Sequence, residues 1–123
     1  MDAKTLIPKD KFDIETAEKL TNYSFAEVKK IVPNLLEWLQ DGNWPVSKIV
    51  ADFLIIHTEN ITQEILQILK GNDEVWKYWV LLAFGNKVKD EIVVNEIKRI
   101  AQNPTEEEIT EGLNEVAKEI IQL

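Results

Sequence analysis

The chain has 123 residues, with 14 basic and 22 acidic side chains and a formal net charge of −8. This length suits a single domain, and the negative charge argues against nucleic acid or an anionic membrane as partner, since both bind positive surfaces. The absence of cysteine excludes a disulfide framework and any cysteine nucleophile or cysteine metal site.

The N-terminal segment, residues 1–11, is predicted to be an extended arm. Pro8 disfavours a helical conformation at Ile7, so Leu6 and Ile7 are expected to pack onto the domain from extended backbone. No long apolar stretch follows Met1, so we expect no signal peptide, and no apolar run approaches the ~20 residues of a membrane helix. We therefore expect a cytoplasmic protein.

Local signals predict a series of helices through the first half of the chain. Asp13 is expected to cap a short helix that ends at Leu20. Ser24 and Glu27 form a capping box that opens a helix to Gln40. Its apolar stripe has helical spacing and comprises Val28, Ile31, Val32, Leu35, Leu36 and Leu39.

Pro33 lies inside this predicted helix, so either the helix kinks there or a new helix begins with Pro33 in its first turn. Gly42 suits the left-handed conformation that follows many helices. Pro45 then suits the first turn of the next helix, which carries the core-facing residues Val46, Ile49, Val50, Phe53 and Leu54.

The second half continues the helical pattern. A helix is predicted over 61–70, and Asp73 can cap another over 74–84. Between Val75 and Phe84 the only charged residue is Lys77, which predicts a central helix that is buried nearly all round.

Two further helices are predicted, over residues 87–102 and from Thr105 to the end of the chain. Thr105 and Glu108 form a second capping box. The last helix, within the acidic segment 104–123, has six acidic residues and one lysine. Its apolar stripe comprises Ile109, Leu113, Val116, Ile120 and Leu123.

Three of the predicted helices end alike, about 30 residues apart, which is within the range of helical repeats. A pair of apolar residues three apart precedes Asp41-Gly42-Asn43, then Gly71-Asn72-Asp73, then Asn103-Pro104. We therefore predict an all-α single domain over 1–123, a HEAT-like stack of about three helix pairs in a right-handed α-α superhelix. The alternative is an irregular helical bundle with similar helix ends.

Parts of the chain resemble known families. Residues 31–41, Ile31-Val32-Pro33-Asn34-Leu35-Leu36-Glu37-Trp38-Leu39-Gln40-Asp41, resemble the inner helix of a HEAT repeat. The blocks 6–11 (LIPKDK), 35–46 (LLEWLQDGNWPV) and 68–79 (ILKGNDEVWKYW) resemble the bacterial family of domain of unknown function 5071. That resemblance implies a HEAT-like fold in a bacterial cytosolic protein, and it brings no activity, cofactor or catalytic residue.

The chain shows no catalytic constellation. His57 is the only histidine, and we expect it at a helix end, partly buried, rather than as a catalytic base. With one histidine and no cysteine, no metal site is predicted. The run Glu106-Glu107-Glu108 is interpreted as a solvated face that complements the dipole of its helix. We therefore expect no cofactor and no enzymatic activity.

Tryptophan is the one unusual feature of the composition, with four residues in the chain. Trp and Tyr dominate binding hot spots, so we predict a recognition edge for a protein partner. The alternative is that the rings fill the spaces between helix pairs. The predicted edge comprises Trp38, Asp41, Trp44, Glu74 and Lys77.

These features favour a non-catalytic protein-interaction scaffold with a basic protein partner, present as a monomer or a weak homodimer. One alternative is an immunity protein or inhibitor that masks a basic toxin, because small size and acidity suit that role. A second alternative is an enzyme, or a regulatory subunit of one, that uses carboxylates or His57 in a cleft.

Overall fold

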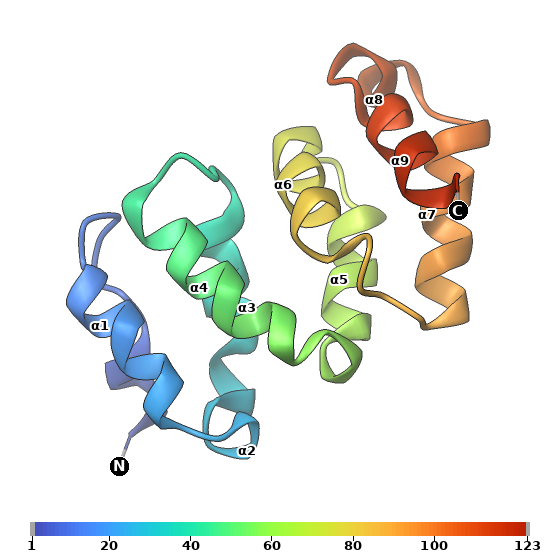
Figure 1. Ribbon diagram of the computed structural model, residues 1–123. Helices are drawn as coiled ribbons and strands as arrows, with labels where there is room; N and C mark the ends of the chain where they lie inside the picture. The colour runs from blue at the N-terminus through green and yellow to red at the C-terminus, as the bar shows by residue number, and fades with distance from the viewer. Residues whose placement is uncertain (1, 123) are drawn as a thin grey trace. The chain divides into compact units, whose positions relative to one another are not determined.

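The computed structural model describes residues 2–122, and every regular element in that range is a helix. The all-α class predicted from the sequence is therefore confirmed. The chain divides into two compact units, Met1–His57 and Thr58–Leu123, called unit 1 and unit 2 and described one at a time (Figure 1). Leu123, predicted as part of the apolar stripe of the last helix, lies outside the described residues.

The N-terminal segment differs from the extended arm that the sequence predicts. Ala3–Leu6 forms a 3-10 helix, η1, and Asp2 caps it by accepting a hydrogen bond from the Lys4 N–H at 3.0 Å. Short acidic side chains bond nearby backbone N–H groups readily, and this stabilises a turn over the extended form. Ile7 is extended as predicted, with φ −83° and ψ 121°, while Leu6 lies in η1 and is buried.

The first α-helix, α1, spans Ile14–Glu18 and continues into the 3-10 helix η2, Lys19–Asn22. Asp13 caps it as predicted, because its carboxylate accepts a hydrogen bond from the Thr16 N–H at 3.3 Å. Ala17 and Leu20 are fully buried, whereas Ile14, the first residue of α1, is 39% exposed.

The helix predicted from the capping box to residue 40 is interrupted. It consists of α2 (Phe25–Val28), η3 (Lys29–Ile31), α3 (Val32–Leu36) and η4 (Glu37–Leu39). Pro33 occupies the first turn of α3, so the second of the two alternatives is confirmed. The reason is that proline has no N–H for the helical bond and its ring clashes with the preceding turn.

Unit 1 ends with its longest helix, α4, Pro45–Ile56, which begins with Pro45 as predicted. It contacts α1 and α3. Gly42 is not left-handed, since Gly112 is the only residue among 2–122 with a positive φ. The chain reverses instead through Asp41, whose side chain accepts a hydrogen bond from the Asn43 N–H at 2.8 Å.

Unit 2 begins with η5 (Thr58–Asn60), α5 (Thr62–Leu69) and α6 (Glu74–Phe84). Asp73 caps α6 as predicted by accepting a hydrogen bond from the Trp76 N–H at 3.0 Å. The expectation that α6 is buried nearly all round is wrong, because two of its apolar residues are 44% and 49% exposed. These residues are Val75 and Leu82.

The next helix, α7, spans Glu91–Gln102 and begins four residues later than predicted. Asp90 sets the start, because its carboxylate accepts hydrogen bonds from the Ile92 and Val93 N–H groups at 2.9 and 3.1 Å. This cap satisfies two of the four free N–H groups at the helix N-terminus.

The single helix predicted at the C-terminus is in fact two, α8 (Glu106–Thr110) and α9 (Leu113–Ile121). Gly112 separates them with φ 73°, a conformation that glycine adopts without steric cost. The break turns Ile109 away from the predicted apolar stripe, and it is 51% exposed.

Within unit 2, α9 contacts both α6 and α7, while α5 contacts α6 and α7. Buried aliphatic residues line these contacts, and they include Ile65, Leu69, Leu81, Ile97 and Leu113. The packing fixes the N-terminus of α6 and the C-terminal half of α7, which carry the polar residues considered next. No helix in the described part of the chain is long and apolar enough to cross a membrane.

Candidate functional site

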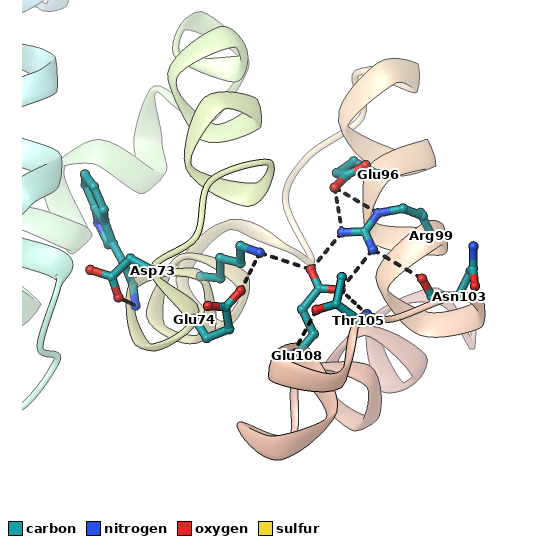
Figure 2. Close-up of polar contacts among 9 residues, drawn as sticks. Asp73, Glu74, Glu96, Arg99, Asn103, Thr105 and Glu108 are labelled. Carbon is teal, nitrogen blue, oxygen red and sulfur yellow. Dashed lines mark hydrogen bonds and ion pairs between the residues drawn. The ribbon is translucent and has the colours of Figure 1, made fainter.

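A polar cavity of about 600 Å³ lies in unit 2. Its walls come from the end of α5 and the following turn, the first turn of α6, the C-terminal half of α7 and the start of α8. The lining residues are Lys70, Gly71, Asn72, Glu74, Lys77, Glu96, Arg99, Thr105, Glu107 and Glu108. Figure 2 shows the ion pairs that connect several of these side chains.

Glu108 lies at the centre of this wall and is 0% exposed. The capping box predicted from the sequence holds it there. The Thr105 side chain accepts a hydrogen bond from the Glu108 N–H at 3.1 Å, and the Thr105 N–H donates to Glu108 Oε1 at 2.8 Å. A capping box therefore places a carboxylate inside the molecule.

Arg99, on α7, binds Glu108 through two parallel hydrogen bonds. Its Nη1 donates to Oε1 at 2.9 Å and its Nη2 to Oε2 at 2.7 Å. Arg99 also binds Glu96, one turn earlier, through Nε at 3.1 Å and Nη2 at 2.9 Å (Figure 2). Such bidentate, charge-assisted pairs fix side-chain geometry more tightly than single bonds do.

Lys77 reaches the same carboxylate from α6, and its Nζ lies 3.1 Å from Glu108 Oε2 and 2.8 Å from Glu74 Oε1. Lys77 is only 3% exposed. A buried ammonium group is costly unless it is paired, and these two carboxylates supply the pairing. The interactions connect α6, α7 and α8.

The network shifts the ionisation of its central groups. Hydrogen bonds from Arg99 are the largest cause that lowers the pKa of Glu108, from 4.5 to about 2, against the opposing effect of burial. The Thr105 backbone bond and Lys77 act in the same direction. The same pairing raises the pKa of Arg99 above its usual value. Glu108 is therefore a permanent anion at neutral pH.

The five residues of the predicted recognition edge are divided between the two units. In unit 1, the rings of Trp38 and Trp44 meet edge to face, with centroids 5.6 Å apart and planes at 72°, and both residues are half-buried. Asp41 lies three residues before Trp44, in the turn that it caps. The three residues thus form one local cluster within unit 1.

Glu74 and Lys77 belong to unit 2, where they line the cavity. The expected role of Lys77 as a surface contact needs correction, because its ammonium group is buried and already binds two carboxylates. Glu74 is half-buried, and its Oε1 accepts a hydrogen bond from Lys77 Nζ. The grouping of all five residues in a single edge remains a prediction.

Sequence reasoning missed Glu96, Arg99 and the buried position of Glu108. The interpretation of Glu106-Glu107-Glu108 as a solvated face is wrong for Glu108, and it holds for the other two residues, which are exposed. Lys77 was the available signal, because it is the only charged residue between Val75 and Phe84 and a buried ammonium group needs an anion as partner. The sequence did not show which of the many carboxylates supplies it.

His57 lies at the C-terminal end of α4, as predicted, and is half-buried. Its ring contacts those of Phe25 and Phe53, with centroids 5.2 and 5.1 Å apart. No groups of three or more His, Cys, Asp or Glu side chains that could hold a metal ion occur among residues 2–122.

The described residues form an all-helical protein with a charged cavity in unit 2. Residues 6–121 match the family model described as domain of unknown function (DUF5071). The chain belongs to that family, and the resemblance carried by its three sequence blocks is confirmed. None of the curated proteins compared with the chain matches it.

Proposed function

We propose that this protein is a protein-interaction scaffold without catalytic activity, whose acidic C-terminal half binds a basic protein. The observation that carries the proposal is the distribution of charge. Unit 2 contains thirteen acidic and seven basic residues, a net charge of −6, whereas unit 1 contains nine and seven, a net charge of −2. Electrostatic complementarity of this kind steers a partner of opposite charge.

The architecture that we propose for the scaffold is a HEAT-like stack of helix pairs in a right-handed α-α superhelix. Such stacks expose extended surfaces that bind proteins and peptides. Contacts between consecutive helices, such as α5 with α6, are consistent with this architecture. We further propose the cytoplasm of a bacterium as its location, which the absence of cysteine favours.

The test is affinity capture with the full chain as bait, compared between two charge-matched variants. The first replaces three exposed acids of unit 2, Glu111, Glu115 and Glu119, by glutamine. The second replaces three exposed acids of unit 1, Glu15, Glu18 and Glu37. All six side chains lie outside the cavity wall, so neither variant alters it.

The first variant is expected to lose most of the captured basic protein and the second to retain it. Binding by the unmodified chain is expected to weaken steeply as salt rises, because exposed charges are screened over about 10 Å at 0.1 M. Equal capture by both variants, or salt-independent capture of an acidic protein, would overturn the proposal.

A further inference from the structure

We propose that the cavity of unit 2 binds one guanidinium group, the side chain of an arginine on the basic partner. This inference rests on the proposed function and adds the chemical group that is recognised. The argument depends on which hydrogen-bonding groups of the cavity wall are already in use and which are not.

Arg99 has no donor left for a ligand. A guanidinium group has five N–H bonds. Its Nε bond goes to Glu96, its two Nη2 bonds to Glu96 and Glu108, and its two Nη1 bonds to Glu108 and the Asn103 carbonyl at 3.3 Å. Arg99 therefore serves to hold the wall together, and it offers nothing to an anionic ligand.

Lys77 is similarly committed, with two of its three N–H bonds given to carboxylates and 3% of its surface exposed. Lys70 is the remaining cation of the wall and is exposed. The buried Lys77 and the half-buried Arg99 thus neutralise carboxylates of the protein itself. An anion that entered the cavity would have to compete with those carboxylates for the same donors.

The acceptors of the wall are not fully used. Within residues 2–122, Glu74 Oε2 and Glu96 Oε1 take part in no hydrogen bond or ion pair. The two carboxylate oxygens of Glu107 also take part in none. Three helices thus contribute carboxylate oxygens without a donor to one cavity. The ligand that such a wall suits is a cation with several N–H groups.

Guanidinium fits this wall better than an ammonium group does. Its planar fork presents donors in several directions and can bind more than one carboxylate, whereas an ammonium group acts as a compact point charge. The volume of about 600 Å³ falls within the range of ligand pockets. It accommodates an arginine side chain together with part of the adjoining peptide.

The experiment is a titration of the isotope-labelled full chain followed by amide NMR shifts. The probe is N-acetyl-arginine amide, and N-acetyl-citrulline amide is the neutral control of nearly the same shape. The arginine probe is expected to shift the amide signals of Asn72, Thr105 and Glu107 at millimolar concentration, and the citrulline probe is expected to leave them unchanged.

A matched pair of variants tests the assignment of the acceptors. Glu107→Gln removes a charged acceptor from the wall and is expected to weaken binding of the arginine probe about tenfold, as for a hydrogen bond to a charged group. Glu106→Gln changes the neighbouring exposed residue, which does not line the cavity, and is expected to leave the affinity unchanged.

Three results would overturn the inference: equal shifts with both probes, tight binding of inorganic phosphate at the same amides, or equal loss of affinity in both variants. Equal binding of N-acetyl-lysine amide would overturn the preference for guanidinium. If the partner is captured through unit 2 while the arginine probe causes no shift, the inference fails and the proposed function stands. If the probe binds but no basic protein is retained, the proposed function fails and so does the assignment of the guanidinium to a partner.

Discussion

The two units each contain a capping box with the same sequence pattern, and the two boxes have opposite environments. In unit 1, Glu27 is exposed, and its carboxylate accepts a hydrogen bond from the Ser24 N–H at 2.9 Å. In unit 2, Glu108 is fully buried and binds Arg99 and Lys77 as well as Thr105. The local motif is therefore the same, while the tertiary surroundings differ completely.

The comparison teaches that a capping motif predicts backbone geometry and says little about burial. Hydrogen bonds from Ser24 lower the pKa of Glu27, but this carboxylate has no ion pair in the described part of the chain. Glu108, in contrast, has its charge balanced by two cations from other helices. Replacing each glutamate by glutamine therefore separates two contributions to the free energy of unfolding, that of the cap itself and that of the ion pairs with other helices.

The largest effect is expected from Glu108→Gln. The change leaves the buried Lys77 and the partly exposed Arg99 with one carboxylate fewer, and breaking a buried ion pair such as Lys77–Glu108 costs about 3–5 kcal/mol. Urea denaturation should show the loss as a lower free energy of unfolding. Hydrogen exchange should locate it in α6, α7 and α8.

Glu27→Gln is the matched control and should shift the denaturation midpoint far less, because no buried cation depends on Glu27. Equal shifts in the two variants would show that the ion network of unit 2 contributes no more than an exposed cap does.

Acid should weaken unit 2 through the same carboxylate. The pKa of Glu108 is about 2 in the folded chain against a reference of 4.5, so its stabilisation is fully present above about pH 4.5 and is lost as pH falls toward 2. At about 1.4 kcal/mol per pKa unit, this amounts to about 3 kcal/mol. Carboxyl NMR of Glu108 should give the midpoint directly, and a value near 4.5 would contradict the network.

Much of the fold follows from signals within one helical turn. Asp13, Asp73 and the two capping boxes mark helix starts through hydrogen bonds to residues at most three positions further along the chain. Pro45 marks the start of α4 through its fixed backbone φ. Such contacts are fixed by the sequence itself, so they are predicted correctly. Competing local signals explain the failures. Gly42 was predicted to be left-handed, but the Asp41 turn needs no left-handed residue. Gly112, for which no such conformation was predicted, adopts it instead.

The candidate site could be predicted only in part. Lys77 and Glu74 were identified from the sequence, but Lys77 was given the wrong environment. Arg99 lies 22 residues after Lys77 in the chain and its pairing with Glu108 depends on how α7 and α8 pack. Among thirteen acidic residues in unit 2, nothing local distinguishes Glu108 from Glu106 or Glu107, since helical rotation and packing decide which of them faces inward.

A loss of stability of intermediate size is expected from a substitution at Gly85, where α6 contacts α9. This loss does not depend on charge. A Cβ atom added at Gly85 would collide with Ile120 Cδ1 and would lie 2.6 Å from the Leu81 carbonyl oxygen. Gly85→Ala should therefore cost about 2 kcal/mol through overpacking, measured by thermal or urea unfolding. Ile120→Ala in the same chain should recover part of that loss. If the double variant is simply the sum of the two single losses, the contact is not the cause.

The smallest effect is expected from Ser24→Ala, which removes the cap of α2 in unit 1 and should cost about 1 kcal/mol. Thr105→Ala removes the equivalent cap of α8. It should cost more, because Thr105 also positions the buried Glu108 against Arg99, and the loss of that positioning weakens the ion pairs. The free energies of unfolding of the two variants, measured in urea at neutral pH, give this excess, which is the additional loss in Thr105→Ala over the loss in Ser24→Ala. An excess that disappears in the Glu108→Gln background would assign it to the ion network, and an excess that persists there would assign it to the cap alone.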